Sequence, residues 1–442
     1  MATARVRVNP RARTTRTRAA LETGRRATVP AGKAPPKFEK DFLKPMGVPA
    51  EGIAAAVRVM ESGRLFRYSA SSAEASEVSM AEAEFAAMTG HKYCIATNSC
   101  SSAIMLTLLG AGVGAGDEVL TNGFTFTALP STIMRIGATP VLVECRSDYT
   151  MDLDDLERKV KSSSAKVLLL SHMRGKVCDM DRVVEICERN GLTLLEDCAH
   201  GCGVKWRGRQ LGYHGLASSY STQSDKVINS GEGGFVVTDS DELAAKAVYW
   251  SGCYERRYGM HATQPPAELC EEAMLGEMNL SCRMTEVTAA CVRPQIATLP
   301  RRVVRYNERH AIVCEAMAEQ CGPLIVVPGA QDDRCEGVGD HLNFYLGWAP
   351  TPSETQEFLS IATTLGVKIG WFCSESNARW HRNWRKYGAP EYDLPNTDAV
   401  LATSFDMKMP PDFSDEDIAH IGTILGYAAA AVGSGKGDRK AR

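Results

Sequence analysis

A single lysine stands among hydroxyl and amide side chains in Ser218-Ser-Tyr-Ser-Thr-Gln-Ser-Asp-Lys-Val-Ile-Asn-Ser-Gly-Glu-Gly-Gly-Phe-Val-Val-Thr238. This residue, Lys226, precedes the glycine-rich Gly231-Glu-Gly-Gly234 by five positions, and the β-rich residues 235–238 follow at once. A free lysine amine has a pKa of about 10.4, so it is nucleophilic at neutral pH only where burial or a nearby cation lowers that pKa. The segment alone is equally consistent with an imine-forming catalytic lysine and with a surface lysine in a hairpin.

Strands alternate with helices on the N-terminal side of this segment. Short apolar strands are predicted at residues 93–96, 119–121, 139–143, 165–171 and 192–195. The alternation predicts an α/β fold with a mostly parallel sheet that helices cover on both faces. In such sheets the ligand site lies beyond the carboxyl ends of the strands. One pocket is therefore expected to collect the residues at or just past those ends, which are Ser99, Phe126, His172, Asp197 and Lys226.

The turn after the first of these strands is rich in hydroxyl side chains. It reads Thr97-Asn-Ser-Cys-Ser-Ser102 and leads directly into a predicted helix. Backbone amides and a helix N-terminus both favour a phosphate at such a turn. An ordinary serine-rich helix cap explains the same pattern, and the sequence does not separate the two.

Asp197 ends an apolar strand, where two interpretations stay open. It is either the cap of a following helix or a carboxylate that keeps a cofactor ring nitrogen protonated. The neighbouring Cys198-Ala-His200-Gly-Cys202 contains three potential metal ligands, but they are too crowded to close one tetrahedral site easily. We therefore expect no metal here.

The length of 442 residues predicts two domains of unequal size. Residues 1–44 hold 12 Lys or Arg against 3 acidic residues, which predicts a disordered basic tail. Residues 45–300 are predicted to form the large domain and residues 301–435 a smaller C-terminal α/β domain. Residues 436–442 are predicted to be a second disordered tail.

Two local patterns bear on the C-terminal half. The helix that starts near residue 286 is expected to run through Gln295 with a kink at Pro294, and Pro300 is expected to break the chain before another helix at residues 303–317. Trp380-His-Arg-Asn-Trp-Arg385 is an aromatic and basic cluster. It either contacts an anionic or sugar-like substrate or packs its tryptophans against the domain face.

Composition bounds the class of protein. Hydrophobic residues make up 44% of the chain and charged residues 23%, as in an ordinary globular protein. No apolar run reaches the roughly 18 residues of a membrane span. The fifteen cysteines lack paired metal spacing, and no signal peptide precedes them, so we expect reduced thiols and a cytoplasmic location.

Several independent motifs fall in the order found in the DegT/StrS family of sugar aminotransferases, which this chain resembles over about residues 46–430. They are Gly112-Val-Gly-Ala-Gly-Asp-Glu-Val119, Phe124-Thr-Phe126, Gly137-Ala-Thr-Pro-Val141, Leu195-Glu-Asp197, Ser221 to Lys226 and Gly231-Glu-Gly-Gly234. The resemblance implies a fold-type I transferase that uses pyridoxal 5′-phosphate (PLP). It also implies a seven-stranded type of sheet in the large domain and a homodimer with shared active sites.

The resemblance also implies a role for each site residue. The implied catalytic residues are Lys226, which carries PLP and moves a proton, Asp197, which pairs with the pyridine nitrogen, and His200 near the cofactor's 3-oxygen. The other implied cofactor-binding residues are Phe126 on the ring face, Ser101, Ser102 and Ser221 at the phosphate, Gln223 beside the lysine, and Asn279 reaching a partner's phosphate.

Several positions depart from the family pattern. Cys100-Ser101 replaces the usual Gly-Thr of the phosphate loop, which keeps a hydroxyl but removes backbone freedom. The family's asparagine usually lies two residues before the arginine matched by Arg283. Ser281 occupies that place here, and Asn279 is offset by two.

The leading hypothesis is amino transfer from glutamate or glutamine to a keto or aldehydo carbon of a sugar, cyclitol or nucleoside-derived substrate, in antibiotic or glycan biosynthesis. An alternative keeps PLP but makes the chain a decarboxylase or oxygenase of an amino-acid-bearing metabolite. A third hypothesis is a PLP-binding regulator whose arginine-rich tail binds nucleic acid. We expect no nucleic-acid partner, because the site residues form a complete catalytic set. We expect no membrane partner, because no apolar run is long enough to span one.

Overall fold

The computed structural model describes residues 33–42, 46–276, 279–328, 332–410 and 412–433. Most of the predicted basic tail and all of the predicted tail at residues 436–442 lie outside these ranges. Residues 33–42 were included in the basic tail, and within them the two phenylalanines pack against the rest of the chain. Phe38 is only 5% exposed, and its ring lies against Phe42 and Phe413. These ring contacts join residues 38–42 to the C-terminal part of the chain.

The large sheet has seven strands in the order β1-β9-β8-β5-β4-β2-β3. Their bounds are β1 (Tyr93–Thr97), β2 (Glu118–Asn122), β3 (Thr139–Val143), β4 (Val167–Ser171), β5 (Thr193–Asp197), β8 (Ala217–Ser221) and β9 (Gly234–Thr238). Only β9 runs against its neighbours, while β8, β5, β4, β2 and β3 pair in parallel. The predicted α/β class with a mostly parallel sheet is confirmed.

Helices cover both faces of this sheet, because its strands are apolar on both sides. The helices of this part are α2 (Ala50–Ser62), α3 (Glu77–Thr89), α4 (Cys100–Gly110), α5 (Ala128–Arg135), α6 (Leu153–Ser162), α7 (Met180–Asn190), α8 (Asp241–Trp250) and α9 (Ala267–Gly276). Along β9, Phe235 and Val237 join a core with α3, α6 and α7, whereas Val236 joins a core with α4, α5 and α8. This alternation is the two-residue period of a strand.

A second sheet of four antiparallel strands lies in the C-terminal half, in the order β10-β12-β14-β13. Its strands are β10 (Ile325–Val326), β12 (His341–Leu346), β13 (Gly370–Trp371) and β14 (Ser404–Lys408), and its helices are α11 (Pro352–Thr364), α12 (Pro395–Ala402) and α13 (Asp415–Gly433). A small third sheet joins β6 (Lys205–Trp206) and β7 (Arg209–Gln210) to β11 (Cys335–Glu336). None of the helices in the described ranges is both long and apolar enough to cross a membrane.

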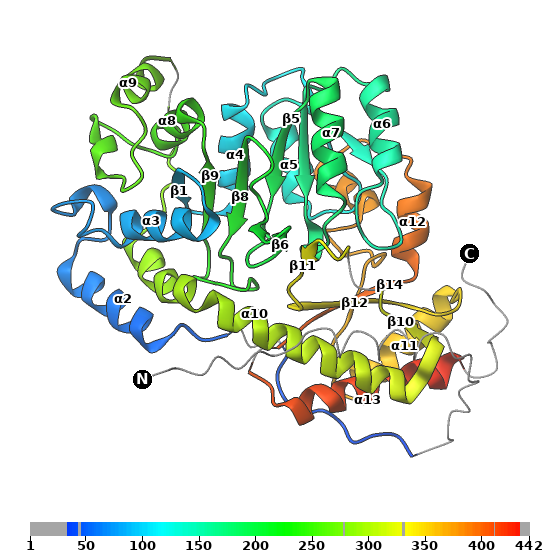
Figure 1. The fold of residues 1–442 in the computed structure, drawn as a ribbon. Coiled ribbons are helices and arrows are strands. Elements are labelled where there is room, and N and C mark those ends of the chain that lie inside the picture. Colours follow the sequence, from blue (N-terminus) through cyan, green and yellow to red (C-terminus); the bar gives the residue numbers. More distant parts are fainter. Residues whose placement is uncertain (1–32, 43–45, 277–278, 329–331, 411, 434–442) are drawn as a thin grey trace, which may run out of the picture.

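One helix, α10 (Glu286–Cys321), joins the two halves and packs against α2, α3 and α13 (Figure 1). The predicted break at Pro300 was wrong, since both prolines lie inside this single 36-residue helix. Side chains add hydrogen bonds to backbone carbonyls near Pro294. Gln295 Nε2 donates to the carbonyl of Cys291 at 2.7 Å, and Thr298 Oγ1 donates to the carbonyl of Pro294 at 3.1 Å.

Candidate active site

A cavity of about 680 Å³ lies where the carboxyl ends of β5 and β8 face the four-stranded sheet. Seven of the nine predicted site residues line it, and these are Ser101, Phe126, Asp197, His200, Ser221, Gln223 and Lys226. Ser102 and Asn279 are not among the lining residues. The far wall comes from β12, β13 and β14, which bring His341, Gly370 and Asp406 into the same cavity.

Lys226 lies in the turn after β8, and that turn fixes its position. Its backbone N–H donates to the carbonyl of Gln223 at 2.9 Å, while Gln223 Oε1 accepts from the backbone N–H of Asp225 at 2.9 Å. The Nζ atom lies 3.0 Å from Nε2 of His200. Burial, assisted by the charge of Arg174, lowers the pKa of Lys226 to about 8. The amine is therefore far more nucleophilic at neutral pH than an ordinary lysine.

Asp197 is the last residue of β5, and two donors orient its buried carboxylate. Ser171 Oγ donates to Oδ2 at 2.8 Å, and the backbone N–H of Ala199 donates to Oδ1 at 3.0 Å. Burial raises the pKa of Asp197 above its usual value. A turn follows Asp197 and no helix begins there, so the interpretation of this residue as a helix cap was wrong.

The hydroxyl-rich turn between β1 and α4 is both a helix cap and a wall of the cavity. Ser99 Oγ accepts from the backbone N–H of Ser102, and Ser102 Oγ donates to Asn98 Oδ1 at 2.7 Å. Ser102 is thus used within the cap, whereas Ser101 lines the cavity. The turn lies close to β9, because a Cβ on Gly234 would be only 2.7 Å from the backbone nitrogen of Cys100.

Four cavity residues that the sequence analysis missed form a cationic side opposite β5. Arg174 follows β4 in the 3-10 turn η2 (Met173–Gly175) with φ of 57°. Its Nη1 lies 2.7 Å from Nε2 of His341, and its Nη2 forms an ion pair with Asp406. Arg379 also lines the cavity, with its guanidinium 5.4 Å from the ring centroid of Phe126. Among these four residues, Arg174 alone carried a local sequence signal, since it lies three residues after the end of β4.

The comparisons with known proteins agree with this geometry. Residues 51–426 match the sequence profile of the DegT/DnrJ/EryC1/StrS aminotransferase family. The chain belongs to this family. Its members are PLP-dependent aminotransferases, and the predicted family and enzyme class are therefore confirmed.

Relatives cover most of the chain. The spore coat polysaccharide biosynthesis protein SpsC of Bacillus subtilis is 34% identical over 387 residues, which are 86% of this chain and 95% of SpsC. The L-glutamine:2-deoxy-scyllo-inosose aminotransferase of Streptoalloteichus tenebrarius is 31% identical over 68% of this chain and 69% of its own. The structure of Spr1654 from Streptococcus pneumoniae in a PLP form has a TM-score of 0.74 at 20% identity, covering 89% of this chain and all of that one.

Within this DegT family member, His172 does not join the cavity that was expected to collect it. Its Nε2 lies 2.9 Å from Oε2 of the buried Glu196. Glu196 Oε1 also accepts from the backbone N–H groups of His214 and Gly215 at 2.8 and 2.9 Å. Successive strand residues point to opposite faces, so Glu196 and His172 meet on the face away from Asp197.

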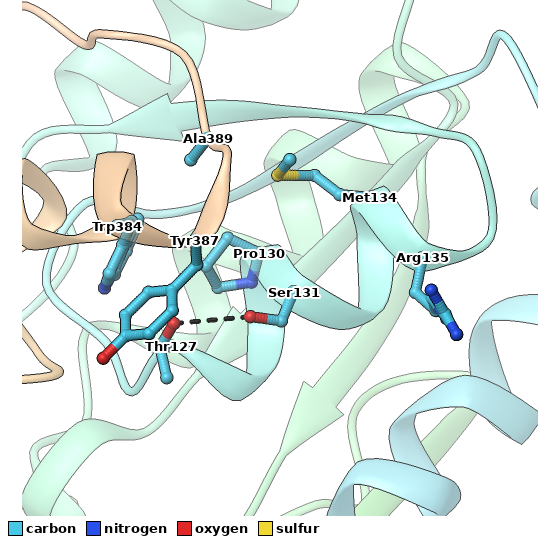
Figure 2. Close-up of a pocket in the computed structure, with 8 residues that line it drawn as sticks. All are labelled: Thr127, Pro130, Ser131, Met134, Arg135, Trp384, Tyr387 and Ala389. Carbon is cyan, nitrogen blue, oxygen red and sulfur yellow. Dashed lines mark hydrogen bonds between the residues drawn. The ribbon is translucent and has the colours of Figure 1, made fainter.

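The aromatic and basic cluster at residues 380–385 also lies outside the cavity lining. Trp384 is 1% exposed and donates from Nε1 to the carbonyl of Ala378 at 2.9 Å, while Trp380 donates to Asp398. Figure 2 shows Trp384 and Tyr387 beside Thr127 and Pro130 of the α5 region, where they line a separate pocket of about 220 Å³. The packing interpretation was correct for the two tryptophans, and only the preceding Arg379 reaches the large cavity.

Proposed function

We propose that this chain transfers an amino group from glutamate or glutamine to a keto or aldehydo carbon of a sugar, cyclitol or nucleoside-derived acceptor, with PLP as cofactor. The observation that carries the proposal is the single cavity lined by both Lys226 and Asp197. An amine and a carboxylate that line one cavity can bind two different groups of one small heterocycle.

The residues of the cavity fit the chemical groups of PLP. Lys226 would bind its aldehyde carbon, Asp197 would face its ring nitrogen, and Phe126, which is 43% exposed, would pack on the ring. Ser101 and Ser221 would donate to the phosphate. When bound, PLP supplies an electron sink for the substrate carbon that loses a proton.

The chain's own groups handle that proton. Lys226, with its pKa near 8, accepts a proton readily and returns it readily close to neutral pH. Burial and the charge of Lys226 lower the pKa of His200 well below its usual value, so the imidazole is neutral. Its Nε2 then accepts a hydrogen bond from the Lys226 amine and keeps that amine directed into the cavity.

The relatives support the acceptor class. One acts in polysaccharide biosynthesis and another on a cyclitol ketone with L-glutamine as donor.

A homodimer is also proposed. The face of α2 that carries Ile53, Val57 and Met60 is exposed although apolar, which suits contact with a second copy. In that dimer Asn279, which does not line the cavity of its own chain, would reach the partner's phosphate site.

The test is a half-reaction without acceptor. PLP-loaded protein mixed with L-glutamate is expected to yield about one equivalent of 2-oxoglutarate per active site and then stop, because no acceptor takes up the amino group. Oxygen and carbon dioxide are recorded in the same vessel. Oxygen uptake or carbon dioxide release without 2-oxoglutarate would contradict amino transfer and favour the oxygenase or decarboxylase alternative.

A further inference from the structure

Arg379 is the one arginine of the cavity that forms no ion pair with any described residue. Other groups already engage three of the cavity carboxylates. Asp406 pairs with Arg174, Asp225 pairs with Lys408 at 3.0 Å, and Asp197 accepts from Ser171. The Nε atom of Arg379 is buried without a hydrogen-bond partner. A buried cation that lacks a partner is costly, so a ligand that supplies the missing charge binds favourably.

The surrounding chain holds Arg379 in place before any ligand arrives. Asn377 Oδ1 accepts from the backbone N–H of Arg379 at 3.0 Å. The carbonyl of Ala378 accepts from the backbone N–H of Thr127 at 3.1 Å and from Trp384 Nε1 at 2.9 Å. The packed tryptophan segment therefore serves as a scaffold for this arginine. Because the backbone at this arginine is fixed in advance, less conformational entropy is lost on binding.

The position and charge of Arg379 define the ligand group. The guanidinium lies over Phe126, the ring that is proposed to pack on the cofactor, so the group it binds belongs to a molecule at the reacting end of the cavity. Asp406 already balances Arg174, which leaves one uncompensated positive charge on Arg379. A planar guanidinium matches a planar carboxylate in charge and in hydrogen-bond geometry.

We propose that Arg379 binds a carboxylate of a reactant, supplied either by the amino donor or by an acidic acceptor. This inference rests on the proposed amino transfer, because it assigns a recognition residue to that same site. It makes Arg379 a specificity residue, and it gives the buried tryptophan segment the function of positioning it.

Binding to the PLP-loaded protein tests the proposal without turnover. Calorimetry compares glutarate with its neutral diamide, as probes of the donor's carboxylate, and D-glucuronate with D-glucose, as probes of an acidic acceptor. Arg379→Gln is compared with Arg385→Gln, a matched loss of charge at an exposed arginine that pairs with Glu391 on the same segment. In at least one pair, Arg379→Gln is expected to weaken binding of the carboxylate probe by about 10- to 100-fold. Binding of the neutral probe of that pair is expected to stay unchanged.

The pair that responds identifies the source of the carboxylate. A loss for glutarate assigns it to the amino donor, and a loss for D-glucuronate assigns it to the acceptor. Equal affinities of wild type for charged and neutral probes in both pairs would overturn the proposal. So would equal effects of the two variants, or tighter binding of glycerol phosphate than of either carboxylate. Because no 2-oxoglutarate is measured here, this failure is distinct from a failure of amino transfer.

Discussion

Two buried clusters of charged side chains differ in how completely their members satisfy one another. In the first, here called the Glu82 cluster, Arg67 Nη1 donates to Glu82 at 2.7 Å, and His261 links Glu82 at 3.1 Å to the hydroxyl of Tyr68 at 3.0 Å. None of these four side chains has a buried polar atom without a partner. In the cavity, by contrast, Arg174 Nε, Arg379 Nε and His200 Nδ1 are buried and unpartnered among the described residues.

The difference separates the two purposes of buried charge. The Glu82 cluster joins the start of the sheet to distant loops, since Glu82 also accepts from the backbone N–H of Ala96 at 2.8 Å. A closed network of this kind contributes stability and binds nothing more. The cavity cluster retains unused donors, and a protein keeps such groups where a ligand will meet them. Removing a charge should therefore harm stability in the first cluster and chemistry in the second.

The largest effect is expected at the cavity, from Lys226→Ala. The variant should lose covalent attachment of PLP and should slow amino transfer by at least about 10²- to 10⁴-fold, the contribution of a positioned general base. Borohydride reduction followed by peptide mass spectrometry reports the attachment. Lys205→Ala, at an exposed lysine that pairs with Glu336, is the control and should behave as wild type. A covalent adduct elsewhere in the chain would refute the assignment of Lys226.

The second-largest effect is expected in the Glu82 cluster, from Glu82→Gln. The change leaves the buried Arg67 without a carboxylate and should lower the free energy of unfolding by about 3–5 kcal/mol. Glu84→Gln is the control on the same helix, because Glu84 is 34% exposed and pairs with Arg293, and about 1 kcal/mol or less is expected there. Urea denaturation measures both.

The acid dependence of the same cluster gives a second check on its ionic character. Burial raises the pKa of Glu82, but Arg67 and His261 outweigh that effect and hold the pKa at about 2. The contribution of Glu82 is therefore complete above its unfolded pKa of 4.5 and declines as the pH falls toward about 2. In Glu82→Gln this decline should vanish from the stability profile. An unchanged profile would contradict the ionic account of the cluster.

The sequence predicted the part of the site that local patterns encode. Asp197 comes at the end of an apolar strand, and Lys226 was also expected near a strand end. The carboxyl ends of parallel strands meet at one edge, so their convergence could be expected. His341 and Asp406 come from another sheet, more than a hundred residues later, and nothing in their local sequence points to Arg174. Likewise, α10 continues through Pro294 and Pro300 and packs against α2, α3 and α13, which lie far from it in the sequence or on another part of the fold. Long-range packing decides these features.

The smallest expected effect concerns the pH at which Lys226 reacts. Above about pH 8 its amine is mostly unprotonated. Below that value, each unit of pH lowers the reactive, unprotonated fraction about tenfold. The rate at which PLP attaches to the apoprotein should therefore rise with pH and level off above about 8. Arg174→Gln removes a nearby positive charge and leaves Asp406 unpaired, and both changes favour the ammonium form. The midpoint should move upward by roughly one unit.

Stopped-flow absorbance across pH 6 to about 10, the span around the unperturbed and lowered lysine pKa values, measures this midpoint. Arg385→Gln removes the same charge at an exposed position and should leave it in place. A midpoint that stays near 8 in Arg174→Gln would mean that burial alone tunes the lysine. The cationic side of the cavity would then serve ligand recognition only, and the contrast with the Glu82 cluster would concern binding rather than reactivity.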